Sequence, residues 1–136
     1  MTVDLSWLAR YRSSEPHFGL ERMEALLALR GNPHLACPVI HLAGTNGKGS
    51  TLAHLRSLLE AKGLRVGVFS SPYLVSLHEQ ISINGLPISD QDLETYLSLY
   101  QDLLAKNSSD QTLLGLTEFE LMTVLAFDYF AAEKPD

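Results

Sequence analysis

The sequence predicts an α/β fold, and three neighbouring stretches predict it. Residues 38–43 are apolar and lead directly into a glycine-rich turn at residues 44–49. A helical pattern of leucines follows over residues 50–62, and a second apolar stretch follows at residues 65–69. Strand, helix and strand in this order form a βαβ unit with parallel strands and a right-handed crossover. We therefore expect an open parallel sheet of the P-loop type, flanked by helices.

The chain before this unit is predicted to be helical. Residues 3–12 have the pattern of a short helix. Residues 21–30 carry apolar side chains at helical spacing, and Gly31 and Pro33 end that helix.

The helix that follows the glycine-rich turn is predicted to bury one face, and Gly63 ends it. The leucines of that face are Leu52, Leu55, Leu58 and Leu59.

The second half of the chain carries clear local signals. Asn84-Gly85 stands between apolar alternations within residues 80–88, which predicts a β-hairpin. Ser89 is a good N-cap for a helix that runs to about residue 105. Thr117 and Glu120 form a T-x-x-E capping box for a helix that ends near residue 133. An open sheet would continue from there into another central strand, so we expect residues 1–136 to be a truncated N-terminal part of a domain.

Composition narrows the class of protein. The chain has 136 residues, 46% of them hydrophobic, and a net charge of −6 without a basic stripe, so nucleic-acid binding is not expected. No apolar run approaches 18 residues, which argues against a membrane span. The N-terminus lacks a signal-peptide pattern, and a single Cys37 cannot form an internal disulfide. These features favour the cytoplasm.

The glycine-rich turn has the groups that hold nucleotide phosphates. Glycines let backbone N–H groups converge on phosphate oxygens, and a helix N-terminus adds about half a positive charge there. Lys48 supplies a mobile charge, and a following hydroxyl can ligate Mg²⁺. The predicted phosphate site comprises Gly44, Thr45, Asn46, Gly47, Lys48, Gly49, Ser50 and Thr51.

This turn departs from the general pattern G-x-x-x-x-G-K-[ST] at two positions. The pattern expects glycine where the chain has Leu42, and a hydroxyl where it has Gly49. The alternative is a glycine-rich turn with an incidental lysine, although three glycines and a lysine at a strand-to-helix junction rarely coincide.

Four ordered blocks resemble the folylpolyglutamate synthase and dihydrofolate synthase family of the Mur-ligase superfamily. The blocks are residues 18–22, Ala43 to Thr51, Ser70-Ser71-Pro72-Tyr73-Leu74, and residues 81–89 together with residues 116–120. The resemblance covers about residues 17–136. It implies an ATP-dependent ligase that joins L-glutamate to a folate or dihydropteroate carboxylate through an acyl phosphate. It also implies an enzyme that is a monomer when full length.

The resemblance assigns roles to individual residues. Lys48 would be catalytic within the phosphate loop, and Ser50 would bind Mg²⁺ beside the phosphates of ATP. Ser71 would ligate a second Mg²⁺, whose other ligands lie beyond residue 136. Phe18, Gly19, Thr117 and Phe119 match positions that line the pterin pocket, although Thr117 also has a complete explanation as a helix cap. Residues 72–80 resemble a mobile loop that closes over the substrates.

One departure and several alternatives remain open. The family often has Asn-Glu-Arg where this chain has His78-Glu79-Gln80. Rival functions are a Mur ligase acting on a UDP-sugar peptide and a non-catalytic nucleotide-binding module. A Mur ligase would need a uridine-binding domain, and only about 40 residues precede the loop. The sequence does not distinguish an enzyme that adds the first glutamate, an enzyme that adds further glutamates to folate, and an enzyme that does both. It also leaves open whether residues 1–136 fold alone.

Overall fold

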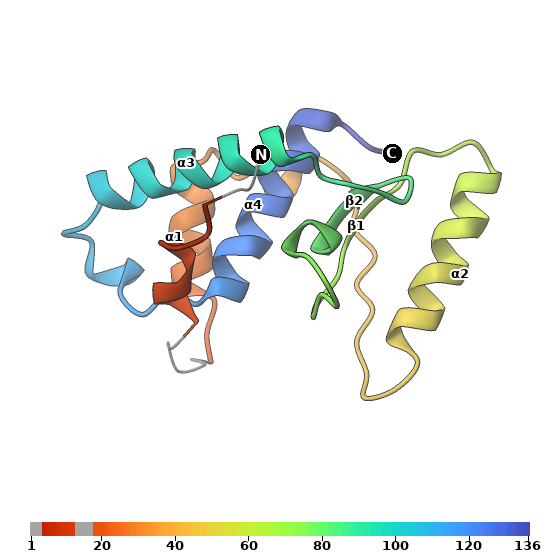
Figure 1. Cartoon of the computed structure of the whole chain (residues 1–136), viewed down its shortest axis with the longest axis horizontal. Coiled ribbons are helices and arrows are strands. Elements are labelled where there is room, and N and C mark those ends of the chain that lie inside the picture. Colours follow the sequence, from red (N-terminus) through yellow and green to blue (C-terminus); the bar gives the residue numbers. More distant parts are fainter. Residues whose placement is uncertain (1–3, 13–17) are drawn as a thin grey trace.

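A computed structural model of the chain describes residues 4–12 and 18–136. A group of helices occupies one side of the molecule, a small sheet lies in the middle, and α2 (Lys48–Ala61) stands at the other end (Figure 1). The mixture of helices and strands agrees with the expected α/β class.

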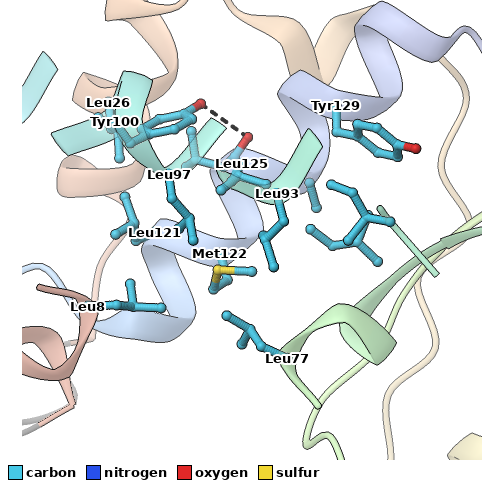
Figure 2. Packing of buried hydrophobic residues seen from close by; sticks show 14 of the residues in the cluster. Leu8, Leu26, Leu77, Leu93, Leu97, Tyr100, Leu121, Met122, Leu125 and Tyr129 are labelled. Carbon is cyan, nitrogen blue, oxygen red and sulfur yellow. Dashed lines mark hydrogen bonds between the residues drawn. The ribbon is translucent and has the colours of Figure 1, made fainter. Parts of the chain in front are cut away.

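The core lies between the helices α1 (Glu21–Leu29), α3 (Asp90–Lys106) and α4 (Glu118–Glu133). Helix α4 is buried on most of its sides, and leucines of α1 and α3 pack around it (Figure 2). The bounds of all three helices agree with the predicted ranges within one or two residues. The helix expected at residues 3–12 is instead a short 3₁₀ helix over Leu8–Tyr11, and residue 3 lies outside the described part.

The sheet consists of β1 (Gly67–Phe69), β2 (Ile81–Ile83) and β3 (Leu86–Pro87), in that order. Both pairs are antiparallel. The predicted hairpin is confirmed, because Asn84 and Gly85 join β2 to β3 with φ angles of 47° and 77°. These left-handed angles are those of the tight turn that Asn-Gly favours. A Cβ at Gly67 would lie 2.9 Å from the ring of Phe130, so the lack of a side chain lets α4 approach the sheet.

The end of the chain is attached to the beginning of this sheet. The backbone N–H of Asp136 donates to the carbonyl of Arg65 at 2.8 Å, and the Arg65 N–H donates to the Asp136 carboxylate at 2.8 Å. The Arg65 guanidinium also contacts the Glu133 carboxylate at 2.9 Å. Together with a bond from the same guanidinium to the Glu133 carbonyl, these contacts fix the end of α4 and the chain after it beside the residue that leads into β1.

The parallel βαβ unit expected from the sequence is not present among the described residues. Residues 38–43 form no strand, and Val39 and Ile40 are 60% and 63% exposed. A strand needs a hydrogen-bonded neighbour, and no other strand runs beside this segment in the described part of the chain. The apolar residues 38–43 therefore led to a wrong prediction of a strand, because a strand forms only where a second strand can pair with it.

The expectation of a buried leucine face on α2 is also wrong. The helix forms, and Gly63 follows its end with a φ angle of 82°, but none of its residues is buried and Leu58 is 64% exposed. Arg56 lies near the hairpin turn at Gly85. No helix among the described residues is long and apolar enough to cross a membrane.

Candidate functional site

The phosphate loop brings glycine-dependent backbone to the start of α2. Gly44 and Gly47 have φ angles of 155° and 79°, and Gly47 is the N-cap residue of the helix. Lys48 is the first residue of α2, and Ser50 and Thr51 lie in its first turn. All residues from 43 to 51 are exposed. A helix N-terminus with free N–H groups and a nearby lysine is suited to an anion.

A pocket of about 670 Å³ lies between the start of α4, the start of α1 and the chain after β1. This volume is within the usual range of small-molecule sites, about 300–1,000 Å³. Its wall is lined by Tyr11, Arg12, Gly19, Met23, Ser71, Pro72, Tyr73, Gln80, Thr117, Glu118, Phe119, Glu120 and Met122. The aromatic and methionine side chains give flat, polarizable surfaces that suit a ring ligand.

An ion pair joins two sides of the pocket wall. The Arg12 Nε donates to the Glu118 carboxylate at 2.5 Å, and the Arg12 Nη2 lies 3.4 Å from the Tyr73 hydroxyl. The hydrogen bond to Glu118 raises the pKa of Arg12. The pair connects the first helical segment, the chain after β1 and the start of α4, so it holds three separate parts of the sequence around one space.

A second ion pair lies deeper. Arg22 of α1 donates to both carboxylate oxygens of Glu120 at 2.8–3.2 Å, and the two side chains are 12% and 10% exposed. Glu120 also accepts from the backbone N–H of Thr117 at 2.9 Å, which completes the predicted capping box. Burial raises the pKa of Glu120, but the bonds from Arg22 and Thr117 outweigh it, so the net shift is downward. Glu120 therefore stays an anion and keeps Thr117 in place.

The structure brings together four of the residues that the sequence singled out. Gly19, Ser71, Thr117 and Phe119 all line the pocket, although they come from segments up to a hundred residues apart. Phe18 does not line it, and its side chain is fully exposed. Ser50 and Ser71 are both exposed, and no group of three or more His, Cys, Asp or Glu residues within the described ranges could hold a metal ion.

Several wall residues were not foreseen. The sequence analysis did not identify Tyr11, Arg12 and Met23 as wall residues. They lie in segments whose apolar spacing predicted only helices, with no sign of a ligand site. Gln80 was noted as a departure from the family, but nothing predicted its burial. Opposite charges at Arg12 and Glu118 carried no local signal, because 106 residues separate them.

No protein-family model matches the chain. Individual relatives do. The chain is 46% identical over 114 residues to a dihydrofolate synthase/folylpolyglutamate synthase of Bacillus subtilis. The matched residues make up 83% of this chain and 26% of the relative. The chain therefore spans about a quarter of the length of the curated relatives it matches.

Solved structures give the same answer. A folylpolyglutamate synthase from Thermotoga maritima superposes with a TM-score of 0.85 at 35% identity, over 97% of this chain and 30% of the other. A complex of folylpolyglutamate synthase (FPGS) with AMPPCP and folate superposes with a TM-score of 0.83 at 34% identity, over 94% of this chain and 32% of the other. Likeness in sequence and in fold extends over most of the residues, and the chain belongs to the folylpolyglutamate synthase and dihydrofolate synthase family.

Proposed function

We propose that this chain is the N-terminal part of an ATP-binding domain in a ligase that joins L-glutamate to the carboxylate of folate or dihydropteroate. The observation that carries the proposal is the pocket in which Gly19, Ser71, Thr117 and Phe119 converge. It supplies a ring-sized space of about 670 Å³ with aromatic walls. The FPGS–AMPPCP–folate complex, which superposes on the chain, supports a nucleotide and a folate as the ligands.

The phosphate loop fits a nucleotide. The left-handed backbone at Gly47 turns the chain into α2, so the first N–H groups of the helix face the loop. Lys48 follows at once and adds a mobile positive charge for the terminal phosphates. In the proposed reaction ATP supplies the phosphoryl group that activates the substrate carboxylate, and the amine of glutamate then displaces phosphate. The chain's own contribution is to position the phosphates and to offset their charge.

The hydroxyls of Ser50 and Ser71 are the proposed Mg²⁺ ligands on this chain. Both are exposed, and hydroxyl oxygens are acceptable partners of this hard cation. The described residues provide no acidic cluster beside them, so the remaining ligands would come from water, phosphate and chain beyond Asp136.

Nucleotide binding by residues 1–136 tests the loop. Lys48→Ala should weaken ATP binding about tenfold or more, because one preorganised charge contact is lost. Lys62→Ala is the matched control, since Lys62 lies at the opposite end of α2 and is also exposed. Calorimetric titration with Mg-ATP gives both affinities. Equal losses in the two variants would contradict a specific role for Lys48.

Turnover tests the ligase assignment. In the full-length protein, ADP formation should require both glutamate and a folate or pteroate. Residues 1–136 with ATP, Mg²⁺, glutamate and dihydropteroate or tetrahydrofolate should give no sustained ADP, because the other metal ligands and the glutamate site are expected beyond Asp136. ADP release by the full-length protein without either co-substrate would favour a different reaction. Sustained, glutamate-dependent release by residues 1–136 would contradict the domain assignment.

A further inference from the structure

Gln80 is a polar residue buried in the wall of the pocket without a partner for its side-chain oxygen. It ends the 3₁₀ turn Leu77–Gln80 just before β2, and only 8% of its surface is exposed. Its Oε1 is shut off from solvent and has no hydrogen-bond partner among the described residues. A buried acceptor without a partner is costly, and most such groups in proteins are satisfied. Its presence in a pocket wall points to a partner supplied by a ligand.

The charged groups of the pocket wall and Thr117 already have partners within the protein. Arg12 is paired with Glu118, and Glu120 is paired with Arg22. Thr117 serves as the cap of α4 and bonds to Glu120. The charges of the wall therefore neutralise one another within the protein. A ligand of this pocket meets aromatic surface, internally paired ions, the hydroxyl of Ser71 and the amide of Gln80.

We propose that Gln80 is a specificity-determining residue that accepts a hydrogen bond from a ring N–H of a neutral heteroaromatic ring in the ligand. The terminal torsion of a glutamine side chain is soft, so the amide can turn its oxygen toward the cavity within its rotamer. This inference rests on the proposed function, because the fused pterin ring of a folate carries such N–H groups.

The residue at this position changes what the pocket wall can recognise. An arginine at this position would only donate hydrogen bonds and would carry a positive charge. The Gln80 amide is neutral; its oxygen accepts hydrogen bonds and its NH2 group donates them. Because the oxygen is the atom without a partner, a ligand edge with N–H donors is favoured at this point of the wall.

Two ligands and two variants of the full-length protein test the proposal by calorimetric titration. The ligands are pteroate and a pteroate derivative whose pterin N–H groups are all methylated. Gln80→Met keeps the length of the side chain but removes the acceptor. Gln91→Met is the matched control, because Gln91 is an exposed residue of α3 outside the pocket.

The expected result is a loss of affinity with no loss of stability. Gln80→Met should weaken pteroate binding about tenfold, the usual cost of one buried hydrogen bond. The same change should alter binding of the methylated derivative less than about twofold, because that ligand has no donor to lose. The thermal unfolding midpoint should stay the same or rise, since the variant removes an unsatisfied buried group. Gln91→Met should match the wild type throughout.

Three results would overturn the assignment, and they separate it from the proposed function. Unchanged pteroate affinity in Gln80→Met removes the role of Gln80 but leaves the pocket's function intact. Equal losses for both ligands, or a loss accompanied by a lower unfolding midpoint, make Gln80 a packing residue only. Failure of the wild type to bind pteroate overturns the proposed function together with this inference.

Discussion

Tyr100 illustrates how a single buried hydroxyl connects the helices of the core. Its Oη donates to the carboxylate of Asp128 on α4 at 3.1 Å, and Arg30 just after α1 donates to the same oxygen at 2.6 Å. Tyr100 is fully buried among leucines of α3 and α4 (Figure 2). Burial raises the pKa of its hydroxyl strongly, and the negative charge of Asp128 adds to the rise. The folded state therefore holds Tyr100 in its neutral form.

The raised pKa of Tyr100 predicts a loss of stability in alkali. In the unfolded chain tyrosine ionises near its ordinary pKa of about 10. The stabilisation is thus complete below pH 10 and falls as pH rises above it, because only the unfolded state releases the proton. Tyr100→Phe should show a smaller fall in the free energy of unfolding between about pH 9 and 11. Urea titrations at both pH values provide the measurement, and parallel pH profiles in the two proteins would contradict the prediction.

At the scale of elements, the loop between β1 and β2 is shaped by one carboxylate. Glu79 accepts from the backbone N–H groups of Leu74, Val75 and Ser76 at 3.0–3.2 Å. The Leu74 bond lowers the pKa of Glu79 most, and the other two bonds lower it further against the opposing effect of burial. Three N–H groups that converge on one oxygen pair hold the loop in a tight turn next to Tyr73 of the pocket wall.

This loop should lose its order in acid. Because the pKa of Glu79 is lowered, the turn is fully held above the ordinary pKa of a glutamate and is released as pH falls through the lowered value. The amide resonances of Leu74, Val75 and Ser76 should move together with a midpoint below the usual glutamate range. Glu79→Gln should abolish this titration, whereas Glu24→Gln on the exposed side of α1 should not. Independent midpoints for the three amides would contradict a shared carboxylate.

The sequence predicted those elements whose signals are local. Asn84-Gly85 specifies its own backbone, and the caps at Ser89 and Thr117 bond to N–H groups three residues away. Such features need no information from the rest of the chain. The strand at residues 38–43 and the buried face of α2 failed for the opposite reason, since both need a neighbour to pair with or to cover them.

The residues of the candidate site could be predicted only where a resemblance to a known family identified them, because they lie far apart in the sequence. Gly19, Ser71 and Thr117 were singled out through a family resemblance, and the structure places them in one pocket. The pairing of Arg12 with Glu118 and the burial of Gln80 follow from tertiary packing. No periodicity or local motif encodes such contacts, so the details that set ligand preference could not be read in advance.

At the scale of the whole molecule, α2 is the least supported element. Its 14 residues include none that is buried, and Figure 1 shows it apart from the helical group. Isolated helices of this length are marginal in water. In residues 1–136, the amides of α2 should therefore exchange with deuterium much faster than those of α4. Mass spectrometry of peptic fragments gives the comparison, and similar protection of both helices would contradict it.

The two borders of the small sheet differ in what they offer to another backbone. On the β3 side the strand has only two residues, and one of them is Pro87, which has no N–H to donate. On the β1 side, the Val66 carbonyl and the Ser70 N–H are bonded to residues that flank β2. Because backbone groups alternate in direction along a strand, the N–H and carbonyl groups of Gly67 and Phe69 point away from β2. No described strand lies there to pair with them. Asp136 is already bonded to Arg65 at this border. The sheet can therefore be extended in one direction only, and the Arg65–Asp136 contact sets the register from which an added strand would start.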